Sequence, residues 1–142
     1  MTGAGLTADD RLAIADLLAR YCHASDERDV EALRAMLTAD TVGDLGPAGV
    51  HEGRDEVLAI SMGILGTVDV TQHQVTTSVM TASPGGAQAK TDFTARHVFD
   101  GRQFTVGGVY HDELVREHDR WLISARRIVV TWTEGDSTVL GL

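Results

Sequence analysis

The fold is decided by the stretch Val68-Asp69-Val70-Thr71-Gln72-His73-Gln74-Val75-Thr76-Thr77-Ser78-Val79. Many of its residues are β-branched, and apolar residues alternate with polar ones, which is typical of a strand with one buried face. Before Gly66, by contrast, apolar residues recur at the spacing of a helix. The hydrophobic period therefore falls from about 3.6 residues to about 2 residues near Gly66, which predicts helices first and strands afterwards.

Three helices are predicted in the first part of the chain. The first follows Thr7, whose hydroxyl can cap it, and its first turn carries Asp9 and Asp10, which suit the positive end of the helix dipole. A second, short helix is expected from Asp29 to Leu37, and a third from about Asp55 to Leu65.

Strand patterns fill the rest of the chain up to about Trp132. The glycine-rich segment 41–53 is expected to form a short strand and a loop. Beyond the deciding stretch, a pair of glycines, Gly107-Gly108, predicts a bulge or bend that would decide which face Tyr110 takes. Helices followed by a long antiparallel meander predict an α+β domain, with three N-terminal helices packed on a strongly curved antiparallel sheet. Its long strands are expected to start near Val68, Gln88, Phe104 and Trp121.

Composition narrows the class of protein. The chain has 142 residues and a mass of 15.2 kDa, which fits one globular domain spanning residues 1–142. A single cysteine, Cys22, excludes a disulfide framework and a cysteine-rich zinc module. A formal net charge of −9 repels a polyanion, so nucleic acid is not an expected partner. No apolar run reaches the roughly 18 residues of a membrane span, and the start Met1-Thr2-Gly3-Ala4-Gly5 is no signal peptide, so we expect a cytoplasmic protein with no membrane partner.

Strand alternation places two histidines, His73 and His97, on apolar faces. In the first helix, Tyr21 lies on the apolar face and Asp26 at its edge. A buried polar group costs about 1–3 kcal/mol if no partner satisfies it, so two inward histidines and an inward acid indicate a site. Each residue alone also has a structural interpretation: a hydrogen-bonded core histidine, a core tyrosine, or an aspartate that ends the first helix or caps the second.

Other kinds of site find little support in the sequence. His73, His97 and Asp26 could ligate a metal as two histidines and one carboxylate, but they lack the tight spacing of a metal motif. The chain has no His-Glu-x-x-His motif, no phosphate-binding glycine loop and no Gly-x-Ser-x-Gly elbow. We therefore expect neither a metal nor a cofactor.

The chain resembles the SnoaL-like branch of the nuclear transport factor 2 superfamily from about Leu6 to Glu134. The resemblance implies a cone-shaped α+β fold, a fold that hosts many chemistries. The motifs that carry it are Arg11-Leu12-Ala13-Ile14-Ala15-Asp16-Leu17-Leu18-Ala19-Arg20-Tyr21, Asp26-Glu27-Arg28-Asp29, His51-Glu52-Gly53-Arg54, Thr71-Gln72-His73, Val106-Gly107-Gly108-Val109-Tyr110 and Trp121-Leu122-Ile123.

Within that superfamily, the site is similar to those of scytalone dehydratase, bile-acid dehydratase and hexachlorocyclohexane dehydrochlorinase. These enzymes have an aspartate just after the first helix and a histidine in the first long strand, which Asp26 and His73 match. Tyr21 matches the tyrosine of the bile-acid dehydratase pattern, and His97 matches the second histidine of scytalone dehydratase. Where scytalone dehydratase has a serine and an asparagine on its third strand, this chain differs, offering Gly108, Tyr110 and Asp112.

The resemblance implies a cofactor-independent lyase of the dehydratase type, acting on a small hydrophobic cyclic, polyketide-like or steroid-like molecule. His73 would be the base, Asp26 would orient it, and His97 and Tyr21 would polarise the carbonyl or protonate the leaving hydroxyl. Two alternatives stay open: an isomerase or cyclase that uses the same pair, and a non-catalytic module that binds a hydrophobic molecule. The expected pocket lining consists of Leu17, Val75, Phe93, Phe99, Phe104, Val106 and Tyr110.

The last strand predicts self-association. Apolar residues lie on both of its faces, so one face needs a partner beyond the helices. The family resemblance implies a dimer or a trimer. The residues concerned are Leu122, Ile128, Val130 and Trp132 on one face and Ile123, Ala125 and Val129 on the other.

Overall fold

The computed structural model describes residues 5–142. Residues 1–4, where no signal peptide is expected, lie outside the described part. No helix of the described residues is long and apolar enough to span a bilayer. The elements run in the order α1 (Ala8–Glu27), α2 (Val30–Ala35), β1 (Leu37–Asp44), η1 (Gly46–Ala48), β2 (Val50–Glu52), α3 (Arg54–Leu65), β3 (Val70–Ser83), β4 (Gly86–Phe99), β5 (Arg102–Glu117), β6 (Arg120–Gly135) and η2 (Ser137–Leu140).

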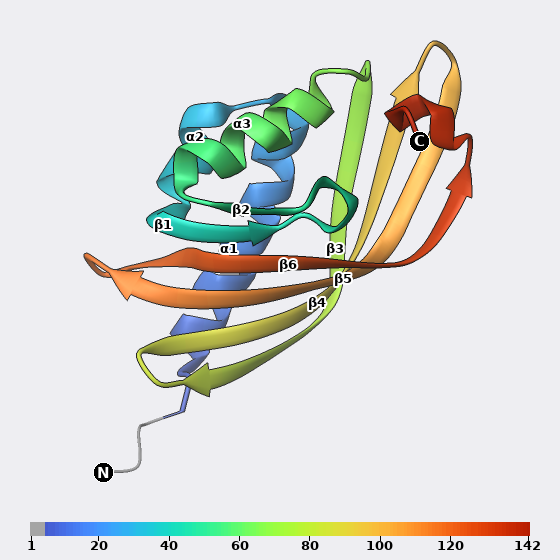
Figure 1. Ribbon diagram of the computed structural model, residues 1–142. Coiled ribbons are helices and arrows are strands. Elements are labelled where there is room, and N and C mark those ends of the chain that lie inside the picture. Colours follow the sequence, from blue (N-terminus) through green and yellow to red (C-terminus); the bar gives the residue numbers. More distant parts are fainter. Residues whose placement is uncertain (1–4) are drawn as a thin grey trace.

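The strands form one sheet in the order β2-β1-β6-β5-β4-β3. The four long strands, β3 to β6, pair antiparallel and bend together, so that the sheet curls like an open cone with the helices on its inner side (Figure 1). The predicted α+β class, the three helices before the four long strands and the curved meander are confirmed.

One part of the sheet differs from the prediction. β1 pairs with β6 in parallel, with Val42 opposite Ala125, so the sheet is mixed rather than antiparallel throughout. Leu37 begins β1 instead of ending the second helix, because α2 stops at Ala35. The two paired strands are far apart in the chain, and local hydrophobic patterning carries no information on which distant strand β1 joins.

The first helix is built as its sequence indicates. Thr7 and Asp10 form a capping box, in which each side chain accepts a hydrogen bond from the other residue's backbone N–H at 3.0 Å. The apolar face of α1 then packs against β3 and the start of β6, where the main hydrophobic cluster forms. The fully buried large apolar residues of the protein are Ile14, Leu18, Leu33, Leu114 and Ile123.

The glycine pair in β5 faces an irregularity in the neighbouring strand. Gly107 pairs with Trp132 while Gly108 pairs with Val130, so the extra residue, Thr131, belongs to β6. A Cβ at position 107 would lie 2.0 Å from the Trp132 ring, and one at 108 would lie 1.9 Å from the Val129 carbonyl oxygen, so only glycine fits either position. β5 keeps its register with β4, which leaves Tyr110 buried on the inner face.

Candidate active site

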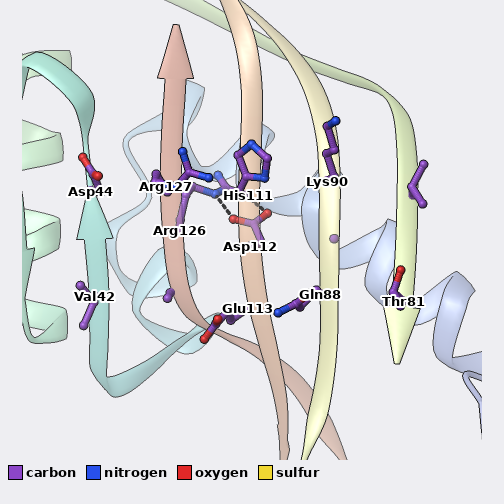
Figure 2. A pocket seen from close by; sticks show the side chains of 13 residues that line it. Val42, Asp44, Thr81, Gln88, Lys90, His111, Asp112, Glu113, Arg126 and Arg127 are labelled. Atoms are coloured by element: carbon purple, nitrogen blue, oxygen red, sulfur yellow. Dashed lines mark hydrogen bonds and ion pairs between the residues drawn. The ribbon is translucent and has the colours of Figure 1, made fainter. Parts of the chain in front are cut away.

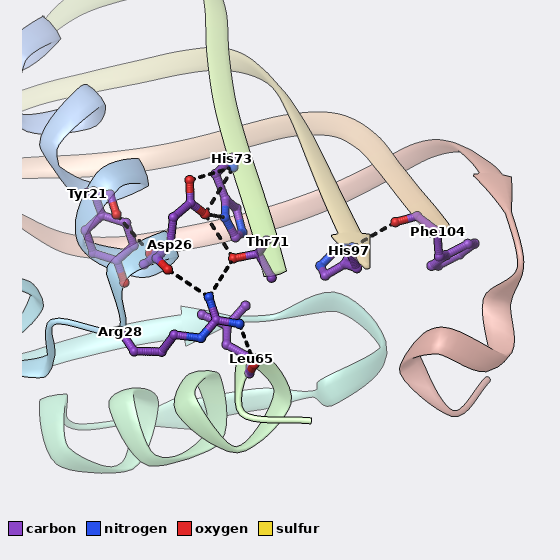
Figure 3. A network of polar contacts seen from close by, with 9 residues as sticks. Tyr21, Asp26, Arg28, Leu65, Thr71, His73, His97 and Phe104 are labelled. Atoms are coloured by element: carbon purple, nitrogen blue, oxygen red, sulfur yellow. Dashed lines mark hydrogen bonds and ion pairs between the residues drawn. The ribbon is translucent and has the colours of Figure 1, made fainter. Parts of the chain in front are cut away.

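The end of α1 brings Asp26 against His73 on β3. The ring Nδ1 of His73 lies 2.6 Å from Oδ1 of Asp26, and the backbone N–H of His73 donates to both carboxylate oxygens at 3.2 and 3.1 Å (Figure 3). An ionised carboxylate only accepts hydrogen bonds, so the proton of a neutral His73 ring lies on Nδ1. This leaves the lone pair of Nε2 available to take a proton.

Asp26 is held as a carboxylate by the groups around it. Burial raises its pKa, but hydrogen bonds from the side chain and backbone of His73 and from the hydroxyl of Thr71 outweigh burial and keep the pKa below its usual value. Thr71 Oγ1 donates to Oδ1 of Asp26 at 3.0 Å, and the guanidinium of Arg28 donates to the same hydroxyl at 3.1 Å. Asp26 is therefore charged at neutral pH and can stabilise an imidazolium beside it.

His97 lies next to this pair on the inner face of β4. Its ring centroid is 6.2 Å from that of His73, with the rings edge to face. Nδ1 of His97 donates to the carbonyl oxygen of Phe104 at 3.1 Å, and burial, the largest influence, lowers the pKa of His97. The ring is thus neutral near pH 7, and its Nε2 offers an acceptor to a ligand rather than a donor.

A second polar cluster lies on the inner face of β5 and β6. Arg126 makes a bidentate ion pair with Asp112, with Nε–Oδ1 and Nη2–Oδ2 distances of 2.7 and 2.9 Å. Its guanidinium carbon lies 4.0 Å from the ring centroid of Tyr110 and 4.7 Å from that of Tyr21. Burial raises the pKa of both phenols, so both keep their protons at neutral pH. The cluster combines a buried charge pair with two neutral hydroxyl donors.

Two pockets lie near these clusters. One of about 710 Å³ lies on the outer face of the sheet, where side chains such as Asp44, Lys90, His111 and Arg127 line it (Figure 2). The other, of about 20 Å³, lies beside Tyr21 and Arg126 and has room for about one water molecule. Neither pocket is lined by His73 or His97.

Comparison with known proteins identifies the family. A family model described as a SnoaL-like domain matches residues 6–127. The chain belongs to the SnoaL-like domain family. No curated protein matches its sequence.

Solved structures share the whole SnoaL-like fold. A protein from Novosphingobium aromaticivorans, provisionally described as an aromatic ring hydroxylase, is 26% identical with a TM-score of 0.85 over 95% of this chain and 99% of its own. Another from that organism, provisionally described as a scytalone dehydratase, is 22% identical with a TM-score of 0.82 over 89% and 87%. The hexachlorocyclohexane dehydrochlorinase LinA-type3 from Novosphingobium barchaimii is 17% identical with a TM-score of 0.79 over 94% and 92%. These neighbours show that the fold extends over nearly the whole chain.

The SnoaL-like fold brings some of the expected site residues together and separates others. Asp26, His73 and His97 are neighbours, whereas Tyr21 lies against Arg126, and no hydrogen bond joins its side chain to Asp26 or His73 within residues 5–142. In the same part of the chain, no three His, Cys, Asp or Glu side chains are grouped so that they could hold a metal ion.

The expected apolar lining is also divided. Four of its residues lie in one cluster on the inner face: Val75, Phe93, Val106 and Tyr110. Within it, Phe93 and Tyr110 stack with their centroids 4.1 Å apart. Leu17 belongs to the main cluster under α1, Phe104 packs with Val68 and Val139, and Phe99 is 38% exposed.

Sequence patterns missed three polar residues of this SnoaL-like site. Thr71 had a usable signal, because it shares the strand face of His73 two residues later. Arg28 lies between two helices, where no periodicity assigns a face. Arg126 follows an extra residue in β6, since Glu113 pairs with Ala125 and Leu114 with Ile123, so alternation counted from the start of the strand fails.

Proposed function

We propose that the protein is a cofactor-independent lyase of the dehydratase type, acting on a small hydrophobic cyclic, polyketide-like or steroid-like molecule. The observation that carries the proposal is the pair of Asp26 and His73, joined at 2.6 Å, while no group among residues 5–142 makes a hydrogen bond to Nε2 of His73. Such an elimination needs a base whose pKa lies near neutral, and imidazole has that property. Membership of the SnoaL-like family, with neighbours that include dehydratase-like and dehydrochlorinase proteins, supports this reaction class.

In the proposed reaction, Nε2 of His73 takes the proton from the carbon next to a carbonyl. The carboxylate of Asp26 stabilises the imidazolium that forms and holds the ring in its orientation. The bond between the neighbouring carbon and its hydroxyl then breaks, and the imidazolium returns the proton to the departing oxygen, so that water leaves and His73 is regenerated. Nε2 of His97 accepts a hydrogen bond from the substrate hydroxyl. The Tyr21 phenol lies beside Arg126 rather than in contact with the pair, so it donates to the carbonyl oxygen only of a substrate that extends from His73 to this second cluster.

Proton abstraction can be tested directly. Incubation of a panel of cyclic and polyketide-like β-hydroxy ketones with the protein in deuterium oxide should give both deuterium next to the carbonyl and the dehydrated product, measured by mass spectrometry. His73→Ala should abolish both signals, whereas His23→Ala, on the exposed side of α1, should leave them unchanged. Exchange with a shifted double bond and no loss of water would favour the isomerase alternative. Binding of panel members without exchange would favour the binding module.

We also propose that the protein forms a dimer or a trimer through the outer face of its sheet. The 710 Å³ pocket there carries charges of both signs, Lys90 and Arg127 beside Asp44 and Glu113, so two copies can offer opposite charges to each other. Light scattering at about 10 µM should give the mass of an oligomer, as expected for a stable interface. Arg127→Glu should weaken association, and Arg20→Glu, exposed on α1, should not. A monomer at this concentration would contradict the proposal.

A further inference from the structure

Arg28 has a backbone conformation that its residue type disfavours. It ends α1 in the left-handed region, with φ 53° and ψ 37°, and its N–H bonds to the carbonyl oxygens of Ala24 and Ser25. Glycine is the usual residue at such a position, because a Cβ is strained there. The backbone of Arg28 is therefore strained.

The side chain of Arg28 joins three elements beside the Asp26–His73 pair. Its Nη1 donates to the backbone carbonyl of Asp26 at 2.8 Å and to the hydroxyl of Thr71 at 3.1 Å (Figure 3). Its Nη2 donates to the carbonyl oxygen of Leu65, at the end of α3, at 2.8 Å. Thr71 is itself 4% exposed, so its hydroxyl is confined to these protein partners.

The donors and acceptors of this group fix the direction of each hydrogen bond. A guanidinium only donates, so the hydroxyl oxygen of Thr71 accepts from Arg28. The single hydroxyl hydrogen of Thr71 is then directed to Oδ1 of Asp26, 3.0 Å away. The same oxygen accepts the Nδ1–H of His73. A one-way chain thus runs from Arg28 through Thr71 to the carboxylate.

We propose that Arg28 is a positioning residue for the pair, acting through the hydroxyl of Thr71 to hold the Asp26 carboxylate as the acceptor of the His73 Nδ1 proton. Its effect on turnover rests on the proposed function, but its effect on the pair does not. A purely structural role is the competing explanation, since the bond to Leu65 ties α1 to α3. That role does not require the hydroxyl of Thr71.

The test compares Thr71→Val, which keeps the shape but removes the hydroxyl, with Thr71→Ser, which keeps the hydroxyl. Nitrogen-15 NMR reports which ring nitrogen of His73 carries the proton, and carbon-13 NMR follows the titration of Asp26. In Thr71→Val, the proton on His73 should be shared between both nitrogens and the pKa of Asp26 should rise. Arg28→Gly should give the same changes, and the double variant should add little to them. Thr71→Ser should match the wild type.

Wild-type spectra for both Thr71→Val and Arg28→Gly would overturn the proposal, and so would a change in Arg28→Gly alone. If Arg28→Gly does not fold, Thr71→Val against Thr71→Ser still decides whether the hydroxyl positions the pair. Measuring the turnover number of the same variants tests the proposed lyase function separately from the positioning role of Arg28. When the pair is catalytic, Thr71→Val should lower kcat about tenfold with little change in KM, the lower end of the loss seen when an outer hydrogen-bonding partner of a site is removed. Changed spectra with unchanged turnover would support the positioning role and contradict the lyase.

Discussion

Replacing His73 by alanine should lower the turnover number by a factor of roughly 100 to 10,000, the usual contribution of a general base. Asp26→Asn should cause a loss in the same range, because the amide no longer stabilises the imidazolium that forms beside it. The double variant should lose little more than His73→Ala alone, since the two side chains act as a unit. Steady-state kinetics on a substrate found by the deuterium-exchange screen measures all three.

Two variants near the pair serve as controls. His97→Ala and Tyr21→Phe should each cost less than the loss of His73, because neither side chain takes the proton. Adding metal ions should restore none of the four variants. If the residues were only part of the core, their replacement would lower the melting temperature and leave turnover per folded molecule intact, and that result would contradict the catalytic role.

Removing the carboxylate of Asp112 should cause the largest loss of stability. The side chain of Asp112 is fully buried and that of its partner Arg126 is 10% exposed, so Asp112→Ala leaves a charge buried without a counterion. Breaking one side of such a pair costs about 3–5 kcal/mol in the free energy of unfolding. For a chain of this length, the melting temperature should fall by roughly 10–20 °C. Thermal unfolding followed by circular dichroism measures the shift.

Two control variants show whether the loss of stability comes from leaving a charge buried or from the loss of an ion pair as such. The double variant Asp112→Leu with Arg126→Met should recover much of the loss, since apolar residues can replace a buried ion pair at little cost. Asp16→Ala breaks the exposed pair with Arg20, in which the side chains are 61% and 71% exposed, and should cost less than about 1 kcal/mol. A melting temperature unchanged in Asp112→Ala would show that Arg126 reaches solvent.

Elements with a local signature were predictable from the sequence. The cap at Thr7 and the apolar spacing that follows it predict α1, and alternation predicts β3 and β4 together with the inward faces of His73 and His97. The position of Asp26 at the edge of the apolar helix face does not by itself predict its contact with His73. That contact could be predicted only from the resemblance, which implies how the first helix packs on the sheet.

The parts of the fold and of the site that the sequence does not predict depend on pairing between distant segments. Extra residues in β6, Ser124 and Thr131, shift its register against β5 twice. These shifts place Arg126 opposite Asp112, and no alternation rule reveals that meeting. The parallel pairing of β1 with β6 is hidden for the same reason.

The parallel pairing of β1 also dictates the order in which the protein can fold. β6 lies between β5 and β1, so the edge formed by β1 and β2 has no sheet to join until residues 120–135 are in place. Forming a contact across so many intervening residues carries a large loop-closure cost, and topologies rich in such contacts fold in milliseconds to seconds rather than microseconds. The edge formed by β1 and β2 can therefore join the sheet only after β6, the last long strand, has been synthesised.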